Sequence, residues 1–339
     1  MTATTTAPTE RPGLRAAFAL PGPYRMVLRQ HRTALWFLVG LFALGTAALA
    51  ADRLWVAHAA DVFTATDCVI RNTTPGCGGS VRGYLDAEYQ FGRNLDYAGM
   101  AMLALPCLIG AFVAGPLVAK DLESGTYKWA WTQSVTPARW LAARLTVCAA
   151  LVVTGTVLFT AVQRWAWTTG PELEYVRAPW YERAMYGSVG TVGVGYALLG
   201  LAIGALVGLL LRRTLPAMAA AAAVTAGAVI ALPLARAHLW ATETVTSSRP
   251  YPMATPDSGY PVGRGMLTAD GGRLPESLCT DRAEGYQQCL AEHQVTGWYN
   301  EFHPASHFWP LQLVETGIVL ALAAAAIYAA FRLLRRRTA

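Results

Sequence analysis

Long apolar runs alternate with polar segments along this chain of 339 residues. A helix that crosses the hydrocarbon core of a bilayer needs about 20 mostly apolar residues. The runs that are long enough predict an all-α polytopic membrane protein with six transmembrane helices. They lie at about 34–52, 98–119, 141–162, 187–211, 215–234 and 311–333.

The fourth and fifth runs are almost continuous. Little more than Arg212 and Arg213 separates them, so a tight helical hairpin is expected there. Gly204 and Gly208 in the fourth run form a GxxxG pattern, which is typical of helices that pack closely in membranes.

The composition favours the same class. Hydrophobic residues make up 54% of the chain and charged residues only 14%, whereas a soluble domain has about 25% charged residues. The formal net charge of +6 therefore does not indicate nucleic-acid binding, because it reflects the basic loops of a membrane protein.

The charges also predict an orientation. Basic residues are concentrated in the short segments 1–33, 120–144, 212–213 and 334–339. Short basic segments remain on the cytoplasmic side of a membrane, so both termini are expected there. The longer and more acidic segments 53–97 and 236–310 are expected as two sizeable extracellular loops.

The N-terminal segment mixes arginines with apolar residues between positions 12 and 32. This pattern favours an interfacial helix within the cytoplasmic segment 1–33, with arginines reaching toward lipid headgroups. Gly22 and the prolines on either side of it interrupt the pattern near its middle.

Four cysteines outside the apolar runs form two close pairs, which makes them candidate disulfides in an oxidising compartment. The alternative is four free thiols. The first half of 236–310 is rich in Pro, Gly and Ser and is expected to be irregular, while 281–296 favours helix. The candidate disulfides join Cys68 with Cys77 and Cys279 with Cys289.

A dense polar and aromatic patch lies between the second and third runs, at 120–140. Gly125 breaks the helix, 126–133 can form about two helical turns, and Thr136 with Pro137 forms an N-cap and first turn that restarts the chain. A short aromatic helix at the membrane surface is therefore expected. Trp and Tyr dominate interface hot spots, so it suits a cytoplasmic partner.

This patch resembles the coupling-helix segment of permease subunits of type-2 ATP-binding-cassette (ABC) exporters, of the actinobacterial type. A second similarity lies at the start of the last run, at Phe308-Trp309-Pro310 with Gln312, Glu315, Thr316 and Gly317. Two departures are Lys120-Asp121, in place of an Arg-Glu pair, and His307, in place of Arg. The similar residues of the patch are Glu123, Gly125, Thr126, Trp131, Thr132, Gln133, Arg139, Trp140 and Leu141.

The resemblance implies a six-span permease domain at 34–333 in a bacterial cytoplasmic membrane. Its partners would be a separate ABC ATPase subunit, a second permease half (a homodimer or a related permease) and membrane lipid, with no nucleic acid. The residues implied in ATPase coupling are Glu123, Gly125, Thr126, Tyr127, Trp129, Trp131 and Gln133.

The chain is not expected to be an enzyme. A phosphate-binding loop requires GxxxxGK[ST], and neither Lys120 nor Lys128 follows a glycine. No catalytic residue and no cofactor are predicted, and ATP hydrolysis is assigned to the partner.

Glu315 lies about five residues inside the last run, near Gln312. A carboxylate at this depth suggests contact with substrate or a protonation step in the pathway. The alternative is a structural carboxylate near the outer surface, bonded to Gln312, to a tyrosine or to an external arginine. His303 and His307 with Glu301 invite a metal interpretation, but two prolines disrupt the spacing, and no metal is predicted.

Three functions remain open. The leading hypothesis is a permease that forms the pathway for export of an amphipathic substrate (a drug, lipid or peptide), because the runs carry almost no charge. The second is a non-transporting sensor or anchor coupled to an ATPase. The third is a membrane enzyme that acts at the outer surface through 236–310.

Overall fold

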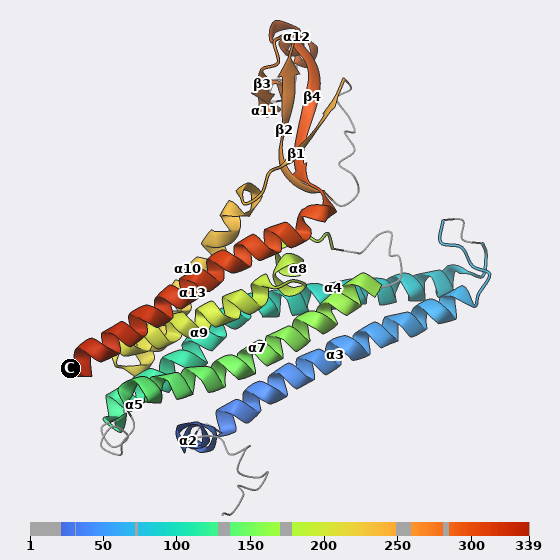
Figure 1. Cartoon of the computed structure of the whole chain (residues 1–339). Coiled ribbons are helices and arrows are strands. Elements are labelled where there is room, and N and C mark those ends of the chain that lie inside the picture. The colour runs from blue at the N-terminus through green and yellow to red at the C-terminus, as the bar shows by residue number, and fades with distance from the viewer. Residues whose placement is uncertain are drawn as a thin grey trace, which may run out of the picture.

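The computed structural model describes residues 22–30, 32–71, 74–127, 136–169, 178–248, 259–280 and 285–338. These residues form a bundle of long helices from which a small antiparallel sheet projects (Figure 1). Six helical segments in the described ranges are long and apolar enough to cross a membrane. The prediction of an all-α polytopic membrane protein with six spans is therefore confirmed.

Two of the six spans combine more than one type of helix. The second span consists of α4, a wider π-helical turn η1, and α5, while the fifth continues into the 3-10 helix η2. In chain order the elements are α3 (Arg32–Thr64), α4 (Gly78–Leu108), η1 (Ile109–Ala114), α5 (Gly115–Ser124), α7 (Pro137–Thr169), α9 (Val192–Leu211), α10 (Thr214–Ala231), η2 (Leu232–His238) and α13 (Phe308–Thr338).

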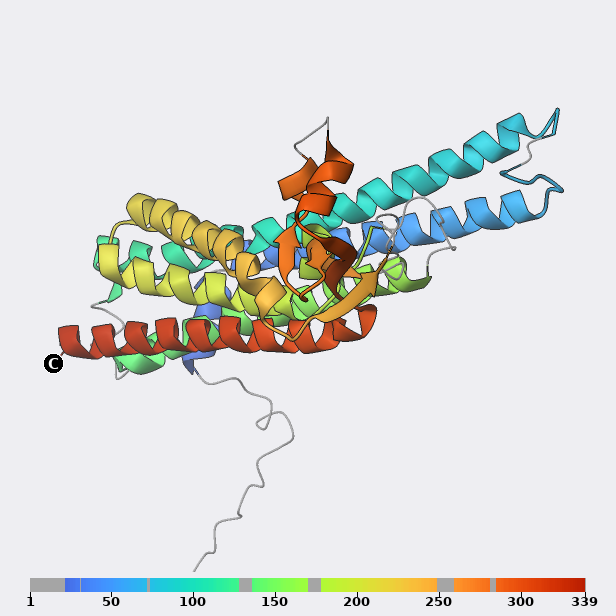
Figure 2. The ribbon, with the colours of Figure 1, turned by 90° about the horizontal axis from the view of Figure 1, so that it is seen from above.

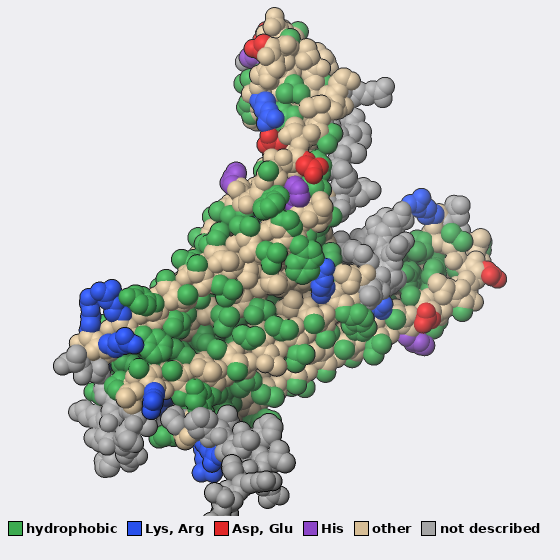
Figure 3. Space-filling model, viewed as in Figure 1, with side chains coloured by type: hydrophobic (Ala, Val, Ile, Leu, Met, Phe, Trp, Pro, Cys, Tyr) green, Lys and Arg blue, Asp and Glu red, His purple; other side chains and the backbone are tan. Residues whose placement is uncertain are grey.

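The two ends of the bundle differ in charge. We call the end that holds the end of α5, the α9–α10 turn and the C-terminus the basic end, and the opposite end, which carries the sheet, the sheet end. On the face in Figure 3, a group of basic side chains lies at the basic end, whereas the acidic ones lie on the sheet and on the far tip of the helices.

The first two spans are longer than the sequence predicted. α3 continues 12 residues beyond position 52, and α4 begins 20 residues before position 98. The expected outer loop 53–97 is thus mostly a helical hairpin that extends past the other helices (Figure 2). Phe63 and Tyr84 stack with ring centroids 4.5 Å apart, and a Cys68–Cys77 disulfide closes the tip.

α9 is the central helix of the bundle and packs against α4, η1, α5, α7, α10 and α13. Glycines permit its closest contacts. A Cβ atom on Gly204 would lie 2.5 Å from the carbonyl oxygen of Gly110, and one on Gly208 would lie 2.9 Å from that of Gly115. The prediction of close packing at this GxxxG pattern is confirmed.

The fourth span starts later than the expected position 187. A short helix α8 (Arg183–Ser188) comes first, and the chain bends before α9 begins at Val192. A Cβ on Gly190 in this bend would lie 2.3 Å from the side chain of Gln312. The bend therefore allows α13 to approach the start of α9.

The predicted hairpin between the fourth and fifth spans is confirmed. Arg212 ends α9 in a left-handed conformation with φ 54°, and the extended Arg213 precedes α10. The two helices are thus joined by only two residues.

The segment 236–310 is more ordered than the sequence suggested, because the half that was expected to be irregular contains strands. Four strands pair antiparallel in the order β1-β4-β2-β3. A Cys279–Cys289 disulfide joins two short helices packed beside the sheet. The elements are β1 (Glu243–Ser247), β2 (Tyr260–Thr268), β3 (Arg273–Pro275), α11 (Ser277–Thr280), α12 (Tyr286–Glu292), β4 (Val295–His303) and the 3-10 turn η3 (Ala305–His307).

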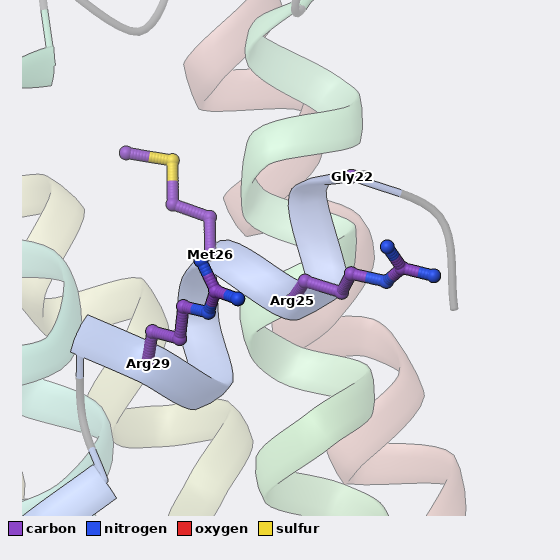
Figure 4. Close-up of a pocket in the computed structure, with 4 residues that line it drawn as sticks. All are labelled: Gly22, Arg25, Met26 and Arg29. Carbon is purple, nitrogen blue, oxygen red and sulfur yellow. The ribbon is translucent and has the colours of Figure 1, made fainter. Parts of the chain in front are cut away.

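The expected interfacial helix begins at Gly22, where the proline-rich interruption was predicted. This helix, α2 (Gly22–Gln30), lies across the bundle against α3 and α7 (Figure 1). Arg25 and Arg29 lie one turn apart beside an open cavity of about 570 Å³, and Met26 is exposed (Figure 4). Residues 12–21 of the predicted helix lie outside the described residues.

Candidate functional site

The coupling segment starts where α5 ends at the basic end. Gly125 has φ +72°, a left-handed conformation that favours glycine, so the helix stops there. Two residues earlier, the carboxylate of Glu123 accepts hydrogen bonds from the backbone N–H of Thr214, at 2.8 Å, and from its hydroxyl, at 2.5 Å. Because Thr214 is the first residue of α10, Glu123 caps that helix and ties the second span to the fifth.

Most of the aromatic coupling residues cannot be located. Residues 128–135, which include Trp129, Trp131 and Gln133, lie outside the described residues. The structure does contain both boundaries of the segment. Tyr127 is the last described residue before the segment and has a helical conformation, and the hydroxyl of Thr136 accepts a hydrogen bond from the N–H of Arg139 at 3.3 Å, which caps α7 as predicted.

A buried ion pair joins the two helices on either side of the coupling segment. Asp121 on α5 contacts the guanidinium of Arg144 on α7, and both residues are buried. The same guanidinium donates to the carbonyl oxygen of Leu117 and lies 4.5 Å from the ring of Trp140. The second and third spans are therefore clamped together one turn from the coupling segment.

The start of the coupling segment also meets the C-terminal helix. Tyr127, Arg212 and Arg337 line a cavity of about 70 Å³ together with three leucines. Arg337 donates a hydrogen bond from Nη1 to the carbonyl oxygen of Leu209. The ends of three spans, the second, the fourth and the sixth, thus meet around this cavity at the basic end.

A second polar cluster lies near the sheet end. Glu315 on α13 accepts hydrogen bonds from Arg236 Nε at 2.7 Å, from Arg236 Nη2 at 3.0 Å and from the Tyr196 hydroxyl at 3.0 Å. Arg236 on η2 also lies over the ring of Tyr186, 3.7 Å from its centroid. The carboxylate is only 2% exposed, and its charge is balanced by a bidentate partner.

Gln312 is buried one turn before Glu315 and makes different contacts. Its amide donates to the carbonyl oxygen of Tyr186 at 2.8 Å and accepts from the N–H of Val192 at 3.0 Å. It therefore holds α13 to the bend between α8 and α9. Glu315 contacts a tyrosine and an arginine rather than Gln312, and these are two of the partners considered for a structural carboxylate.

Arg144 and Arg236 are the functional candidates that the sequence interpretation missed. Arg236 lies in the predicted outer loop 236–310 and Arg144 lies at the start of the predicted third run, and each completes a buried ion pair. The position of Arg144 in the sequence could have identified it as the partner of Asp121. The two residues lie near opposite ends of the loop that joins the second and third spans, so they are expected at a similar depth in the membrane. No comparable signal links Arg236 with Glu315, which is 79 residues away.

His303 and His307 lie together beneath the sheet. Their Nδ1 atoms are 3.2 Å apart, and His303 Nε2 is 3.0 Å from the carbonyl oxygen of Ala237. Burial lowers the pKa of His303 below its usual 6.5. Within the described ranges, no three side chains of His, Cys, Asp or Glu lie close enough to hold a metal ion.

Both predicted disulfides are present, Cys68–Cys77 at the hairpin tip and Cys279–Cys289 beside the sheet. Cys107 and Cys148 remain free thiols within spans. Each disulfide closes a short loop at the sheet end of the molecule, away from the coupling segment.

Comparison with known proteins gives one family. The family model described as "ABC-2 membrane transporter related" matches residues 39–236, which is more than half of the chain. The match includes the first five spans and the coupling segment. No curated protein and no solved structure matches the chain.

Proposed function

Since the chain belongs to the ABC-2 membrane transporter related family, we propose that it is the permease subunit of an exporter, driven by a separate ABC ATPase subunit. The observation that carries this proposal is the family match over the spans on either side of the coupling segment. We assign the chain to the actinobacterial type on the residues of the coupling segment and on Phe308-Trp309-Pro310. In this assignment, two permease halves form the pathway.

The basic end is assigned to the cytoplasm and the sheet end to the outside of a bacterial cell membrane. Short basic segments support this orientation. The disulfides support it as well, because both lie at the sheet end and disulfides persist in oxidising compartments.

In this proposal the ATPase binds the coupling segment and moves it. Closure of the ATPase on ATP displaces residues 123–135. Since Asp121 and Arg144 clamp α5 to α7 and Glu123 caps α10, the second, third and fifth spans receive the displacement together. The π-helical turn η1 lies within the second span, between α4 and α5, and such turns are common at functional sites.

At the sheet end, the Arg236–Glu315 pair would respond to this displacement of the spans. It joins η2, the extension of the fifth span, to α13. A movement of α10 relative to α13 must therefore stretch or break a buried ion pair, which sets a threshold for opening the outer side of the pathway. Before such a movement the pair would only hold η2 to α13, so this role is compatible with the structural alternative for Glu315.

The substrate is proposed to be amphipathic and exported. The two buried ion pairs of the described spans, Asp121–Arg144 and Arg236–Glu315, lie near opposite ends of the bundle, and the predicted runs between them carry almost no charge. An apolar pathway favours a drug, lipid or peptide over a small ion.

The first test is gentle-detergent purification of the full chain from its native membranes, followed by mass spectrometry of the proteins that copurify. An ABC ATPase in about equal amount is the expected result. The variant Trp131→Ala should lose at least about tenfold of the bound ATPase, because aromatic hot-spot residues contribute about 2 kcal/mol or more.

The matched control is Trp55→Ala, which removes an exposed tryptophan from the projecting part of α3. It should retain the ATPase at the level of the unaltered chain. Equal ATPase binding by Trp131→Ala and Trp55→Ala would reject the coupling segment as the docking site, and a complex without any nucleotide-binding subunit would reject the proposed function.

Glu315→Gln tests the outer ion pair. We expect export to fall by at least about tenfold per folded complex, because an uncompensated Arg236 in a buried site costs about 3–5 kcal/mol and shifts the balance of states. The measurement is substrate accumulation in cells, normalised to the amount of ATPase-bound permease. Unchanged export would leave Glu315 without a role in the cycle.

A sensor that does not transport is the second candidate. The disulfide-bearing sheet at the outer side favours it, because a compact outer domain can bind a ligand. Both candidates require the ATPase. A sensor would change ATPase activity on ligand binding with no change in substrate accumulation, and this outcome would replace the exporter.

A further inference from the structure

The hydrogen bonds of the second span are irregular at η1 (Ile109–Ala114), between α4 and α5. The N–H of Gly115 donates to the carbonyl oxygen of Gly110, five residues earlier, whereas an α-helix uses the carbonyl group four residues earlier. Pro106 lies three residues before η1. A proline has no N–H, so Pro106 cannot bond to the carbonyl oxygen of Met102 one turn before it.

A second proline lies just after η1. Pro116 is the second residue of α5, so it too has no N–H to donate to the preceding turn. Sharp bends in helices occur at prolines and at π-helical turns, and here two prolines lie on either side of one such turn. The second span is therefore expected to bend most easily at η1.

The central helix α9 touches the span closely at this place. A Cβ atom on Gly200 would lie 2.2 Å from the carbonyl oxygen of Pro106, and one on Gly204 would lie 2.5 Å from that of Gly110. The two backbones thus meet without side chains between them. Since glycines have no side chain that could interlock, the second span can change its angle about this contact.

The two parts of the span that η1 separates have different neighbours. α5 is tied to α7 by the Asp121–Arg144 ion pair and to α10 through Glu123. α4 instead packs against α3 and α8, and a Cβ atom on Gly99 would lie 2.7 Å from the carbonyl oxygen of Ala184 in α8. A displacement at the basic end can therefore move α5 while α4 stays with α3 and α8.

A buried hydroxyl group lies beside η1. Thr225 on α10 is fully buried, and among the described residues its hydroxyl has no hydrogen-bond partner. It is close to the turn, because a Cβ atom on Gly110 would lie 3.2 Å from Thr225 Oγ1. A helical threonine can donate to the carbonyl oxygen one turn earlier, as Thr156 does to Val152 at 2.7 Å. The unpartnered hydroxyl of Thr225 costs free energy in this arrangement.

We propose that η1 is a hinge with a second state, in which α5 has a different angle to α4 and the Thr225 hydroxyl donates to a backbone carbonyl group of η1. The second state satisfies the hydroxyl that the first leaves without a partner. It bends the span where the two prolines and the wide turn have already weakened the helix. The hinge follows from the fold and does not depend on the proposed export function, in which the ATPase would only supply the force.

The test is pulsed electron paramagnetic resonance of the full chain in detergent. Nitroxide labels are attached to Thr33→Cys on α3 and Lys120→Cys on α5, which are both exposed positions. The free thiols Cys107 and Cys148 are replaced by alanine. The labelled chain is diluted with unlabelled chain, so that only distances within one chain are recorded. No ATPase is present, so the result is independent of the proposed function.

Two label distances are expected for Thr33 with Lys120, one for each state. A second pair, Thr33→Cys with Arg332→Cys on α13, does not involve the second span and should give one distance. Thr225→Val removes the hydroxyl and keeps the shape of the side chain. The ratio of the second state to the first should then fall by at least about fivefold, which corresponds to the loss of one hydrogen bond.

Two further variants are the controls for Thr225→Val. Thr225→Ser retains the hydroxyl and should keep both distances in their original ratio. Thr160→Val removes a hydroxyl of α7 that also lacks a partner among the described residues, and it should leave the ratio unchanged.

Several outcomes would overturn the proposal. A single distance between Thr33 and Lys120 in the chain with native Thr225 would exclude the hinge, and this measurement requires no change at Thr225. An unchanged ratio in Thr225→Val, or an equal change in Thr160→Val, would exclude the assigned hydrogen bond. Two distances between Thr33 and Arg332 would show that whole helices move, rather than that the second span bends at η1.

Discussion

At the scale of single residues, the bundle is held by two buried ion pairs near opposite ends. Asp121–Arg144 joins the second and third spans near the basic end, and Arg236–Glu315 joins the fifth and sixth near the sheet end. A buried charge is tolerated only when a partner compensates it. Each pair therefore fixes which helices are neighbours, in addition to any contribution to stability.

Removal of one partner tests this requirement. We expect Arg144→Met to lower the free energy of unfolding by about 3–5 kcal/mol, because Asp121 would remain buried without its partner. The measurement is thermal unfolding of the full chain in detergent. Arg139→Met, at an exposed position on the same helix, should change the free energy by less than about 0.5 kcal/mol.

The double variant Asp121→Asn with Arg144→Met provides the control for charge. It should recover part of the lost stability, since no uncompensated charge then remains. If the double variant is as unstable as Arg144→Met alone, packing rather than charge is responsible for the loss.

His303 predicts a pH dependence. Its pKa is lowered by burial, so the folded protein binds the proton less readily than the unfolded chain. Stability is therefore constant above pH about 6.5, the usual pKa, and falls as the pH decreases below that value. Thermal unfolding between pH 8 and pH 5 should show this decrease.

His303→Gln removes the titrating group while it keeps a donor for Ala237, so the decrease at low pH should become smaller. The exposed His58 is the matched control, and His58→Gln should keep the original pH profile. If His303→Gln and the unaltered chain have the same profile, another group is responsible for the acid sensitivity.

The residues of the candidate site could be predicted only in part. Glu315, Gln312 and Glu123 stand out in the sequence as polar residues at the edges of apolar runs. Their partners do not, because Arg236 and Thr214 are brought to them by tertiary packing. A single sequence contains no signal for contacts over 79 or 91 residues.

At the scale of elements, hydrophobicity predicted the number of helices better than their length. Residues 53–64 and 78–97 are too polar to be read as transmembrane, yet they continue α3 and α4 without a break. Helix propensity and contacts between the two helices, such as Asn94 with Asp52 at 3.0 Å, are sufficient to extend them into water. A prediction that limits each helix to the length needed to cross a bilayer therefore places the end of α3 too early and the start of α4 too late.

The contact between α9 and the second span predicts a strong dependence on glycine. Gly204→Ala would place a Cβ atom 2.5 Å from a backbone carbonyl oxygen, so the helices must separate. We expect a loss of about 1–3 kcal/mol in the free energy of unfolding. The measurement is thermal unfolding in detergent, with size exclusion to confirm that the chain remains monodisperse.

Gly227→Ala on α10 is the matched control, because a Cβ atom there would have no neighbour within 4 Å. It should be neutral or slightly stabilising, since alanine is the better helix former. Equal losses for the two variants would mean that the close approach at Gly204 is not responsible.

At the scale of the whole molecule, the four-stranded sheet is the largest difference from the sequence prediction. Its central strands β2 and β4 pair across 27 to 43 residues, and β1 pairs with β4 across more than 50. Pro and Gly in β2 suggested an irregular segment, but Gly265 lies where the carbonyl oxygen of Leu274 and the ring of Tyr299 leave no room for a side chain. The glycine at this position is therefore explained by close packing within the sheet rather than by a turn.

The disulfides should be detectable by counting thiols. Only Cys107 and Cys148 are free, so two maleimide mass tags are expected on the denatured chain before reduction, and six afterwards. Each disulfide closes a loop of about 10 residues, and its reduction should cost about 2–3 kcal/mol in the chain-entropy description. Six tags before reduction would contradict both disulfides.

The two-residue turn at Arg212 and Arg213 has a consequence for how the protein is made. Neither helix of this pair can be inverted alone, since two residues cannot cross a bilayer about 30 Å thick. α9 and α10 must therefore enter the lipid as a unit, and in the proposed orientation the arginine pair stays on the cytoplasmic side. Lengthening this turn would uncouple two insertion events that the present chain combines into one.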